Sequence, residues 1–222
     1  MSYPTPRQIG LFDRVAAIYV IENGPYFGLP GVEPWAAPSR DAREYAGPWP
    51  VVAHPPCKRW GRYWDGGPSK CARRKLGDDD GCFAAALASV REWGGVLEHP
   101  EASHAFAHFG LNKPPRWGGW VVAGDGLGWV CCVEQGHYGH RARKATWLYA
   151  VGTELPSLIW GPSEAVIGAG EVYATEAERK RAKKTGAVQR MGQRERAATP
   201  APFRELLIGI ARTAALRRVG AA

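Results

Sequence analysis

Cys57 is the residue whose surroundings best suit covalent chemistry. It follows two prolines in the stretch VVAHPPCKRWGRYW, residues 51–64. Residues 50–53 form a short apolar run that predicts a buried strand, which the prolines end while fixing the backbone before the thiol. Basic side chains follow at once, at Lys58, Arg59 and Arg62. Because nearby positive charge favours the nucleophilic thiolate, we interpret Cys57 as a candidate nucleophile; the alternative is an inert, buried structural cysteine.

A carboxylate stands at the end of a second predicted strand. Glu98 follows an apolar stretch in GGVLEHPEAS, residues 94–103, and Pro100 ends the strand. In open α/β sheets the carboxyl ends of the strands border the ligand site, so Glu98 is expected to share a cleft mouth with Cys57. Partial burial would raise its pKa, which suits a proton donor. The alternative is a strand-end residue that only hydrogen-bonds a loop.

A third group of polar side chains lies between two apolar stretches in VEQGHYGHRARKATWLYAVG, residues 133–152. Its members are Gln135, His137, His140, Arg141, Arg143 and Lys144. Such a turn could hold a phosphate or a base turned out of the duplex, and the alternative is a basic hairpin with no such role. A zinc site built from His137, His140 and Cys131 or Cys132 lacks standard ligand spacing, so no metal is predicted.

The elements that would position these residues form a βαβ unit. The strand at 50–53 is followed by a Gly- and charge-rich loop over 58–81, a helix over 82–93 and a strand at 96–98. Strands joined in this way predict a Rossmann-like, mostly parallel α/β sheet. Aromatic side chains on the long loop are candidates to stack on a displaced base: Trp60, Tyr63 and Trp64.

Apolar runs between turn residues predict further strands at residues 15–21, 128–133 and 146–151. The last two would return as a hairpin. Residues 39–45 predict a short helix capped by Ser39.

The C-terminal part of the chain has a different composition. Residues 176–196 are strongly charged and predict either a solvated helix or a basic tail. Residues 203–218 have helical apolar spacing. We therefore predict an α/β domain over residues 1–170 and a basic tail with a C-terminal helix over residues 171–222.

Composition restricts the classes of protein that fit. The 222 residues suit one domain, or one domain and a tail. A formal net charge of +8 favours a polyanionic partner, nucleic acid first, although a basic protein without one would carry the same charge. No apolar run suits a bilayer and no signal core begins the chain, so we expect a cytoplasmic protein with no membrane contact. The odd number of cysteines argues against a disulfide scaffold, and no obligate protein partner is evident.

The order of the three motifs resembles that of the cytosine-5 DNA methyltransferases. In that family a Pro-Cys motif supplies the nucleophile, a Glu-Asn-Val or Glu-Asn-Pro motif supplies the acid, and a later Gln/Arg motif contacts the base. Matching places here are held by Cys57, Glu98, and Arg141 or Arg143. The stretch QGHYGHRARKATWLY also resembles the Gln-Tyr-Gly…Arg-Lys-Pro-Thr…Leu-Trp pattern of small phage-borne relatives, and ATPAPF, residues 198–203, resembles a closing segment of that group.

The resemblance implies a phage-type enzyme, acting in a bacterial host, that modifies the 5-position of a pyrimidine in DNA. Cys57 would add to ring carbon 6, and Glu98 would protonate or hydrogen-bond ring nitrogen 3. The implied one-carbon donor is S-adenosylmethionine, held by Glu22, Gly24, Gly28 and Glu33. The implied DNA contacts come from Lys58, Arg59, Arg62, Gln135, His140 and Lys144.

A second hypothesis belongs to a different class of protein. The loop at residues 22–28 reads ENGPYFG and lacks the tight Gly-x-Gly of the family's cofactor loop. This favours a non-catalytic DNA-binding or decoy protein that keeps the scaffold, whereas the presence of both Cys57 and Glu98 favours the enzyme.

Overall fold

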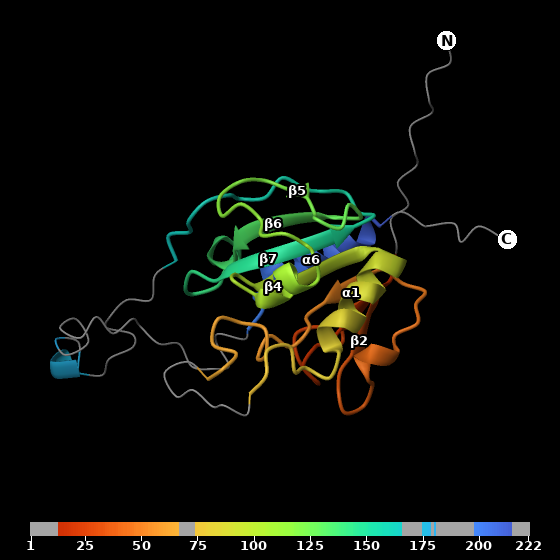
Figure 1. The fold of residues 1–222 in the computed structure, drawn as a ribbon, viewed down its shortest axis with the longest axis horizontal. Helices are drawn as coiled ribbons and strands as arrows, with labels where there is room; N and C mark the ends of the chain where they lie inside the picture. The colour runs from red at the N-terminus through yellow and green to blue at the C-terminus, as the bar shows by residue number, and fades with distance from the viewer. Residues whose placement is uncertain (1–12, 67–73, 166–174, 179, 181–197, 215–222) are drawn as a thin grey trace, which may run out of the picture.

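The computed structural model describes residues 13–66, 74–165, 175–178, 180 and 198–214. They form a seven-stranded sheet in the order β2-β1-β3-β4-β7-β6-β5 (Figure 1). The strands are β1 (Val15–Ile18), β2 (Val32–Trp35), β3 (Val51–Ala53), β4 (Gly95–Pro100), β5 (Val121–Val122), β6 (Trp129–Glu134) and β7 (Ala145–Val151). No helix in this part of the chain is long and apolar enough to cross a membrane.

The sheet is mixed, with a parallel half and an antiparallel half. Strands β2, β1, β3 and β4 run parallel, as the βαβ pattern predicts. Strand β7 is antiparallel to both of its neighbours, β4 and β6, and β5 is antiparallel to β6. The α/β class is therefore confirmed, but the expectation of a mostly parallel sheet is only half right. Residues 135–144 are too short a connection for a crossover, so β6 and β7 return as the predicted hairpin.

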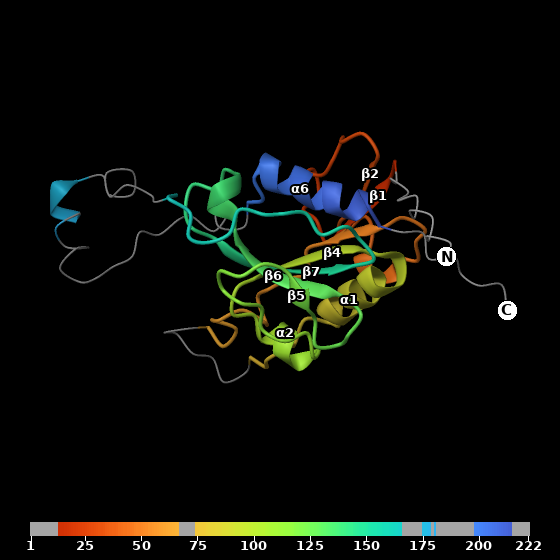
Figure 2. The same cartoon turned by 90° about the horizontal axis from the view of Figure 1, so that it is seen from above.

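Helices cover both faces of the sheet (Figure 2). Helix α1 (Cys82–Trp93) packs on β3 and β4 from one side, where α2 (His104–His108) also lies, and α6 (Ala201–Arg212) crosses β1, β3 and β4 on the other. Successive β3 residues divide between the two layers: Val51 and Ala53 join the α1 side of the core, and Val52 joins the α6 side. Strands buried on both faces read as continuous apolar runs, which is why β1 and β3 were recognisable.

Helix α1 has the bounds that its sequence predicts, Cys82–Trp93. It ends at two glycines with positive φ, 76° at Gly94 and 122° at Gly95. A Cβ on Gly95 would overlap the Val51 carbonyl of the neighbouring strand. The second glycine is therefore required both by its backbone conformation and by the close approach of β3.

Three local predictions need correction. The helix expected over 39–45 is only a 3₁₀ turn, η1 (Ala42–Glu44), and its cap is Asp41 rather than Ser39. Strand β1 ends at Ile18, before the predicted limit of residue 21. Strand β2 was not predicted because VEPW carries a charge and Pro34; it lies at the edge of the sheet, where a proline is tolerated.

The C-terminal helix, expected in a separate tail, packs on the sheet. Phe203 and Leu207 of α6 are fully buried. Arg204 and Arg212 donate hydrogen bonds to the carbonyls of Pro25 and Pro30. Most of the charged segment at 176–196 lies outside the described residues, so the division at residue 170 stays a prediction.

Candidate functional site

The three sequence motifs meet at the carboxylate of Glu98. Strands β3 and β4 are parallel neighbours, with Ala53 opposite Leu97, so the residues that follow both positions lie together. His54 Nδ1 lies 3.1 Å from one Glu98 oxygen, Oε2. Gln135 Nε2 donates to the other oxygen, Oε1, at 3.1 Å. The predicted closeness of the Cys57 loop and Glu98 is thereby confirmed, but Glu98 does not end its strand, because β4 continues to Pro100 in its pairing with β7.

Glu98 is ionised in this setting. Burial alone would raise its pKa, but the hydrogen bond from His54 and the positive fields of His54, Lys144 and His99 together lower the pKa to about 2. The expectation of a raised pKa was therefore wrong, because it counted desolvation and not the partners. At neutral pH the free Glu98 is an acceptor, and it can act as an acid only after it receives a proton.

The thiol of Cys57 is exposed and close enough to Glu98 for the two charges to interact. Desolvation by the surrounding loops and then the negative charge of Glu98 raise the pKa of Cys57, and Lys144 opposes this increase. The expectation that the basic residues after Cys57 favour the thiolate was wrong in direction. Lys58 and Arg62 are exposed, and water screens their charges.

Gln135 is buried and holds Glu98 in place. Its Nε2 donates to Thr146 Oγ1 at 2.9 Å as well as to Glu98, so both amide hydrogens have acceptors. Its backbone N–H donates to the Lys144 carbonyl and closes the hairpin. The predicted contact of Gln135 with DNA is thus replaced, in this structure, by a positioning role.

Two residues that sequence reasoning missed complete this group. His54 directly follows β3, and its Nε2 lies 2.7 Å from the hydroxyl of Tyr26, a buried residue of the β1–β2 loop. Burial is the main cause that raises the pKa of Tyr26, so its phenol stays protonated. Position could have revealed His54, since it directly precedes Pro-Pro-Cys at the end of a buried strand. No local signal marked Tyr26.

The other predicted site residues are distributed around this centre. Lys144 Nζ donates to the Ala198 carbonyl at 3.0 Å while its charge acts on Glu98 and Cys57. Arg143 is exposed and its Nε donates to the Ser163 carbonyl at 2.7 Å; Arg141 is exposed. His140 is buried, with Nδ1 2.7 Å from the Ala142 carbonyl, which indicates a role in shaping the turn.

The aromatic residues of the loop after Cys57 differ in exposure. Trp60 was expected to reach a displaced base, but it is buried against Phe83 and Phe109, and its Nε1 donates to Asp79. Tyr63 is 67% exposed and Trp64 is half-buried, so both remain candidates for stacking. Arg59 of the same loop is half-buried.

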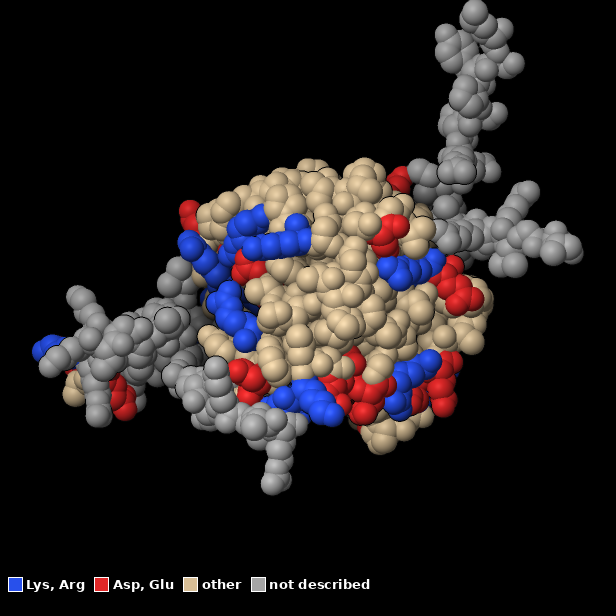
Figure 3. Space-filling view, in the orientation of Figure 1, with Lys and Arg blue, Asp and Glu red and all other residues tan. Residues whose placement is uncertain are grey.

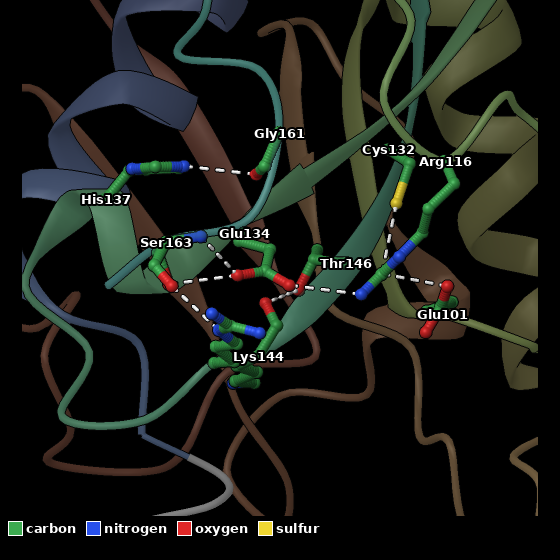
Figure 4. A network of polar contacts seen from close by, with 10 residues as sticks. Glu101, Arg116, Cys132, Glu134, His137, Lys144, Thr146, Gly161 and Ser163 are labelled. Atoms are coloured by element: carbon green, nitrogen blue, oxygen red, sulfur yellow. Dashed lines mark hydrogen bonds and ion pairs between the residues drawn. The ribbon is translucent and has the colours of Figure 1, made fainter. Parts of the chain in front are cut away.

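A second polar network supports the end of β6, next to Gln135 (Figure 4). The buried carboxylate of Glu134 accepts hydrogen bonds from the Ser163 backbone N–H at 2.7 Å and from its hydroxyl at 2.9 Å. Arg116 donates to Glu134 at 3.0 Å and also pairs with Glu101 at 2.8 Å. This network fixes the backbone from which Gln135 reaches Glu98.

A cavity of about 650 Å³ lies where the chain changes direction across the sheet. From β1 the chain leads to β2 on one side and later to β3 on the other, and ligands of open α/β sheets bind outside such a switch point. The lining comes from the loops after β1, β2 and β3 and from the start of α1: Tyr19, Val20, Ile21, Glu22, Ala37, Pro38, Asp41, Ala42, Arg43, Pro56, Asp80 and Cys82.

Of the four residues predicted to hold a cofactor, Glu22 lines this cavity and accepts a hydrogen bond from Ser39 at 2.9 Å. Gly24, Gly28 and Glu33 are not among the described residues that line it. Glu33 pairs with Arg40 at 2.8 Å and accepts a hydrogen bond from Trp35 Nε1 at 3.1 Å. The hydroxyl of Tyr19 is buried and has no hydrogen-bond partner within the described part of the chain.

Basic side chains gather on one flank of the molecule (Figure 3). This flank is on the left in Figure 3, where β6 and the 135–144 connection lie in Figure 1. The loops at this edge carry exposed cations at Lys58, Arg62, Arg141 and Arg143. No three potential metal ligands converge among residues 13–66, 74–165 and 198–214.

In comparisons with known proteins, no family model, no curated protein and no solved structure matches the chain.

Proposed function

We propose that the protein is a DNA-modifying enzyme, similar to cytosine-5 methyltransferases, that acts at the 5-position of a pyrimidine through Cys57. The observation that carries this proposal is the meeting of three separate motifs at one carboxylate. Glu98 contacts the histidine that begins the Pro-Pro-Cys loop and the glutamine that begins the 135–144 connection. A nucleophile, a group able to carry a proton and a basic turn are thereby placed at one edge of the sheet.

In the proposed reaction, the Cys57 thiolate forms a bond to ring carbon 6. The π electrons of the carbon 5–carbon 6 bond move into the ring, and ring nitrogen 3 takes a proton through Glu98. Carbon 5 thereby becomes nucleophilic. After carbon 5 has been substituted, its proton passes to solvent, and the electron pair of that C–H bond re-forms the carbon 5–carbon 6 double bond. The bond from sulfur to carbon 6 breaks with its electron pair on sulfur, and ring nitrogen 3 gives up the proton that it took.

The cavity at the switch point is the proposed cofactor site. Its lining carries the carboxylates of Glu22, Asp41 and Asp80, of which Asp41 is paired with Arg43 of the same lining; Glu22 and Asp80 would accept hydrogen bonds from ribose hydroxyls. The unpartnered Tyr19 hydroxyl offers a buried donor. S-adenosylmethionine, when bound there, would supply a methyl group. Pro56 belongs to this lining and adjoins Cys57, so cofactor and nucleophile would occupy neighbouring positions.

The sheet supports a Rossmann-like, methyltransferase-like assignment. Its parallel strands bracket a switch point, and the antiparallel β7 lies between β4 and β6, which resembles the sheets of methyltransferases. For DNA, the proposal relies on the exposed cations around the site and on Tyr63. A base must leave the duplex to reach Cys57, and stacking on an exposed ring offsets part of the few kcal/mol that this costs.

The direct test is the composition of DNA from cells that express the protein. Nucleosides released from that DNA and analysed by mass spectrometry should contain a pyrimidine modified at carbon 5. The Cys57→Ser variant, expressed to the same level, is the control and should yield unmodified DNA because a hydroxyl is a far weaker nucleophile without a dedicated base. Equal nucleoside profiles from the two strains would count against the proposal.

S-adenosylmethionine should raise the melting temperature of the purified protein. At 100 times its dissociation constant a ligand adds about 2.7 kcal/mol of stability. For a chain of this size that corresponds to about 5–10 °C. Asp80→Asn removes one carboxylate from the cavity and should reduce the shift, whereas Asp78→Asn, an exposed neighbour outside the cavity, should not. An unchanged melting temperature of the wild-type protein would remove S-adenosylmethionine from the proposal.

One observation favours the non-catalytic alternative. In the free protein the pKa of Cys57 is raised and Glu98 is ionised, so neither group is in its reactive state. A DNA-binding protein that keeps the scaffold has no need of reactive groups. The nucleoside test decides between the two functions, since only the enzyme changes the DNA.

A further inference from the structure

We propose that His54 is the proton source for the reaction: a relay formed by Tyr26, His54 and Glu98 delivers a proton to ring nitrogen 3 of the bound cytosine. This inference rests on the proposed function and extends it to residues that the motifs do not assign. It answers the problem that an ionised Glu98 poses, since a carboxylate without a proton cannot protonate a base.

The contacts of Glu98 identify His54 as the donor. Among the residues that the structure describes, each carboxylate oxygen has one hydrogen-bonded side chain, Gln135 on Oε1 and His54 on Oε2. An amide does not release its protons in this pH range, whereas an imidazole does. Lys144 acts on Glu98 through its field, and its ammonium group hydrogen-bonds the Ala198 carbonyl. Of these three side chains, His54 is therefore the one that can pass a proton to Glu98.

The tautomer of His54 follows from its two partners. The ionised Glu98 only accepts, so Nδ1 carries a hydrogen. The phenol of Tyr26 then donates to Nε2 across 2.7 Å. Solvent can reach the His54 side chain, which is 13% exposed, and the Tyr26 oxygen can accept an N–H formed at Nε2. The imidazolium and the carboxylate together hold one transferable proton.

The transfer balances in two steps. The Nδ1–H bond of the imidazolium breaks as an O–H bond forms on Glu98 Oε2. That carboxyl proton then passes to ring nitrogen 3 as the thiolate adds to carbon 6. His54 is left neutral with a hydrogen on Nε2, and Glu98 is again ionised. Ring nitrogen 3 releases its proton to solvent when the thiolate leaves, and solvent supplies the proton for the next cycle to His54.

The charged and titratable groups around the relay bear on its test near neutral pH. Those that face it or its partners are Cys57, His99, Lys144, Arg204 and Glu205. Burial lowers the pKa of His99 to about 4, so it is neutral throughout this window. Cys57 loses its proton as the pH rises, and its effect on the rate has the opposite sign.

The test uses exchange of the hydrogen at carbon 5, which needs no methyl donor. Reversible addition of Cys57 to DNA that carries [5-³H]cytosine releases tritium into water. Release rates are measured from about pH 5.5 to about 8.5 and divided by the rate at which iodoacetamide alkylates Cys57, identified by peptide mass spectrometry. Dividing by the alkylation rate corrects the release rate for the pH-dependent change in the fraction of Cys57 that is thiolate. For the wild-type protein the quotient should fall as the pH rises, approaching about tenfold per pH unit.

His54→Asn is the decisive variant, because its amide keeps a donor near the Nδ1 position but carries no transferable proton. At the acid end its quotient should be at least about tenfold below that of the wild-type protein, and it should not fall with pH. His104→Asn is the matched control: it makes the same change at an exposed histidine outside the relay and should keep the wild-type slope.

The two proposals fail in different ways. No tritium release from the wild-type protein at any pH would remove the proposed function itself. If the wild-type protein releases tritium but its quotient does not change with pH, the relay is overturned. This outcome is read from the wild-type protein alone. A folded His54→Asn protein with the wild-type slope would also overturn it.

Discussion

DNA containing 5-fluorocytosine should become covalently bound to the wild-type protein, and Cys57→Ser should abolish the complex. Fluorine at carbon 5 cannot leave as a proton does, so the bond from sulfur to carbon 6 persists once carbon 5 has been substituted. The complex is measured as protein that migrates with labelled DNA under denaturing conditions, in the presence of S-adenosylmethionine. The loss should be complete within detection, because the serine hydroxyl has no dedicated base beside it.

Two further variants test whether the covalent complex depends on the proposed site residues. Glu98→Gln should weaken the adduct strongly, since the ring nitrogen loses the carboxyl group that passes it a proton. Cys71→Ser, at the next cysteine along the chain, should leave the adduct intact. If plain DNA binding persists while no adduct forms with 5-fluorocytosine or 5-fluorouracil and any donor, the non-catalytic function is the better account.

Glu134→Gln should lower the free energy of unfolding by about 3 kcal/mol, the low end of the range for breaking a buried ion pair. Glu134 is 1% exposed and accepts from Ser163 twice and from Arg116 once. An amide in its place keeps the volume but removes the charge and one acceptor. The low end applies because Arg116 is 35% exposed and keeps its second partner. Urea denaturation at 25 °C measures the change.

The matched control is Glu101→Gln, which removes the other partner of Arg116. Glu101 is 27% exposed, and a pair of this kind contributes less than about 1 kcal/mol. If the two variants lower the free energy of unfolding by similar amounts, the stability of the network does not depend mainly on Glu134. Loss of stability confined to Glu134 would fit its place beside Gln135, where it fixes the end of β6.

Helix α1 and strand β3 show what local pattern determines. Both are bounded by residues with strong local effects, glycines after α1 and prolines after β3, and both were predicted within a residue or two. The place of β7 between β4 and β6 was not predicted, because pairing depends on the whole sheet and not on any short stretch. Local sequence therefore predicted β1, β3, β4 and the β6–β7 hairpin, and left open the edge strand β2 and the pairing of β7 with β4.

The candidate site, like the fold, was predicted only in part. The closeness of the Cys57 loop to Glu98 followed from two strands that end at one edge. The ionisation of Glu98 did not, since it depends on His54 and Lys144, which are distant in sequence and meet it only in the folded chain. Tyr26 could not be predicted as a site residue for the same reason. Nothing in the sequence of its turn-rich loop indicates that it contacts His54 in the folded chain.

The packing of α6 has a consequence for how this protein folds as it is synthesised. The helix that seals one face of β1, β3 and β4 follows every strand in chain order, and it is tied to the β1–β2 loop by Arg204 and Arg212. While a ribosome is still making the chain, that apolar face has no cover of its own. Contacts between such distant parts of a sequence form late and slowly. The nascent chain should therefore expose an aggregation-prone surface until its last helix emerges, and bound chaperones would protect it during that interval.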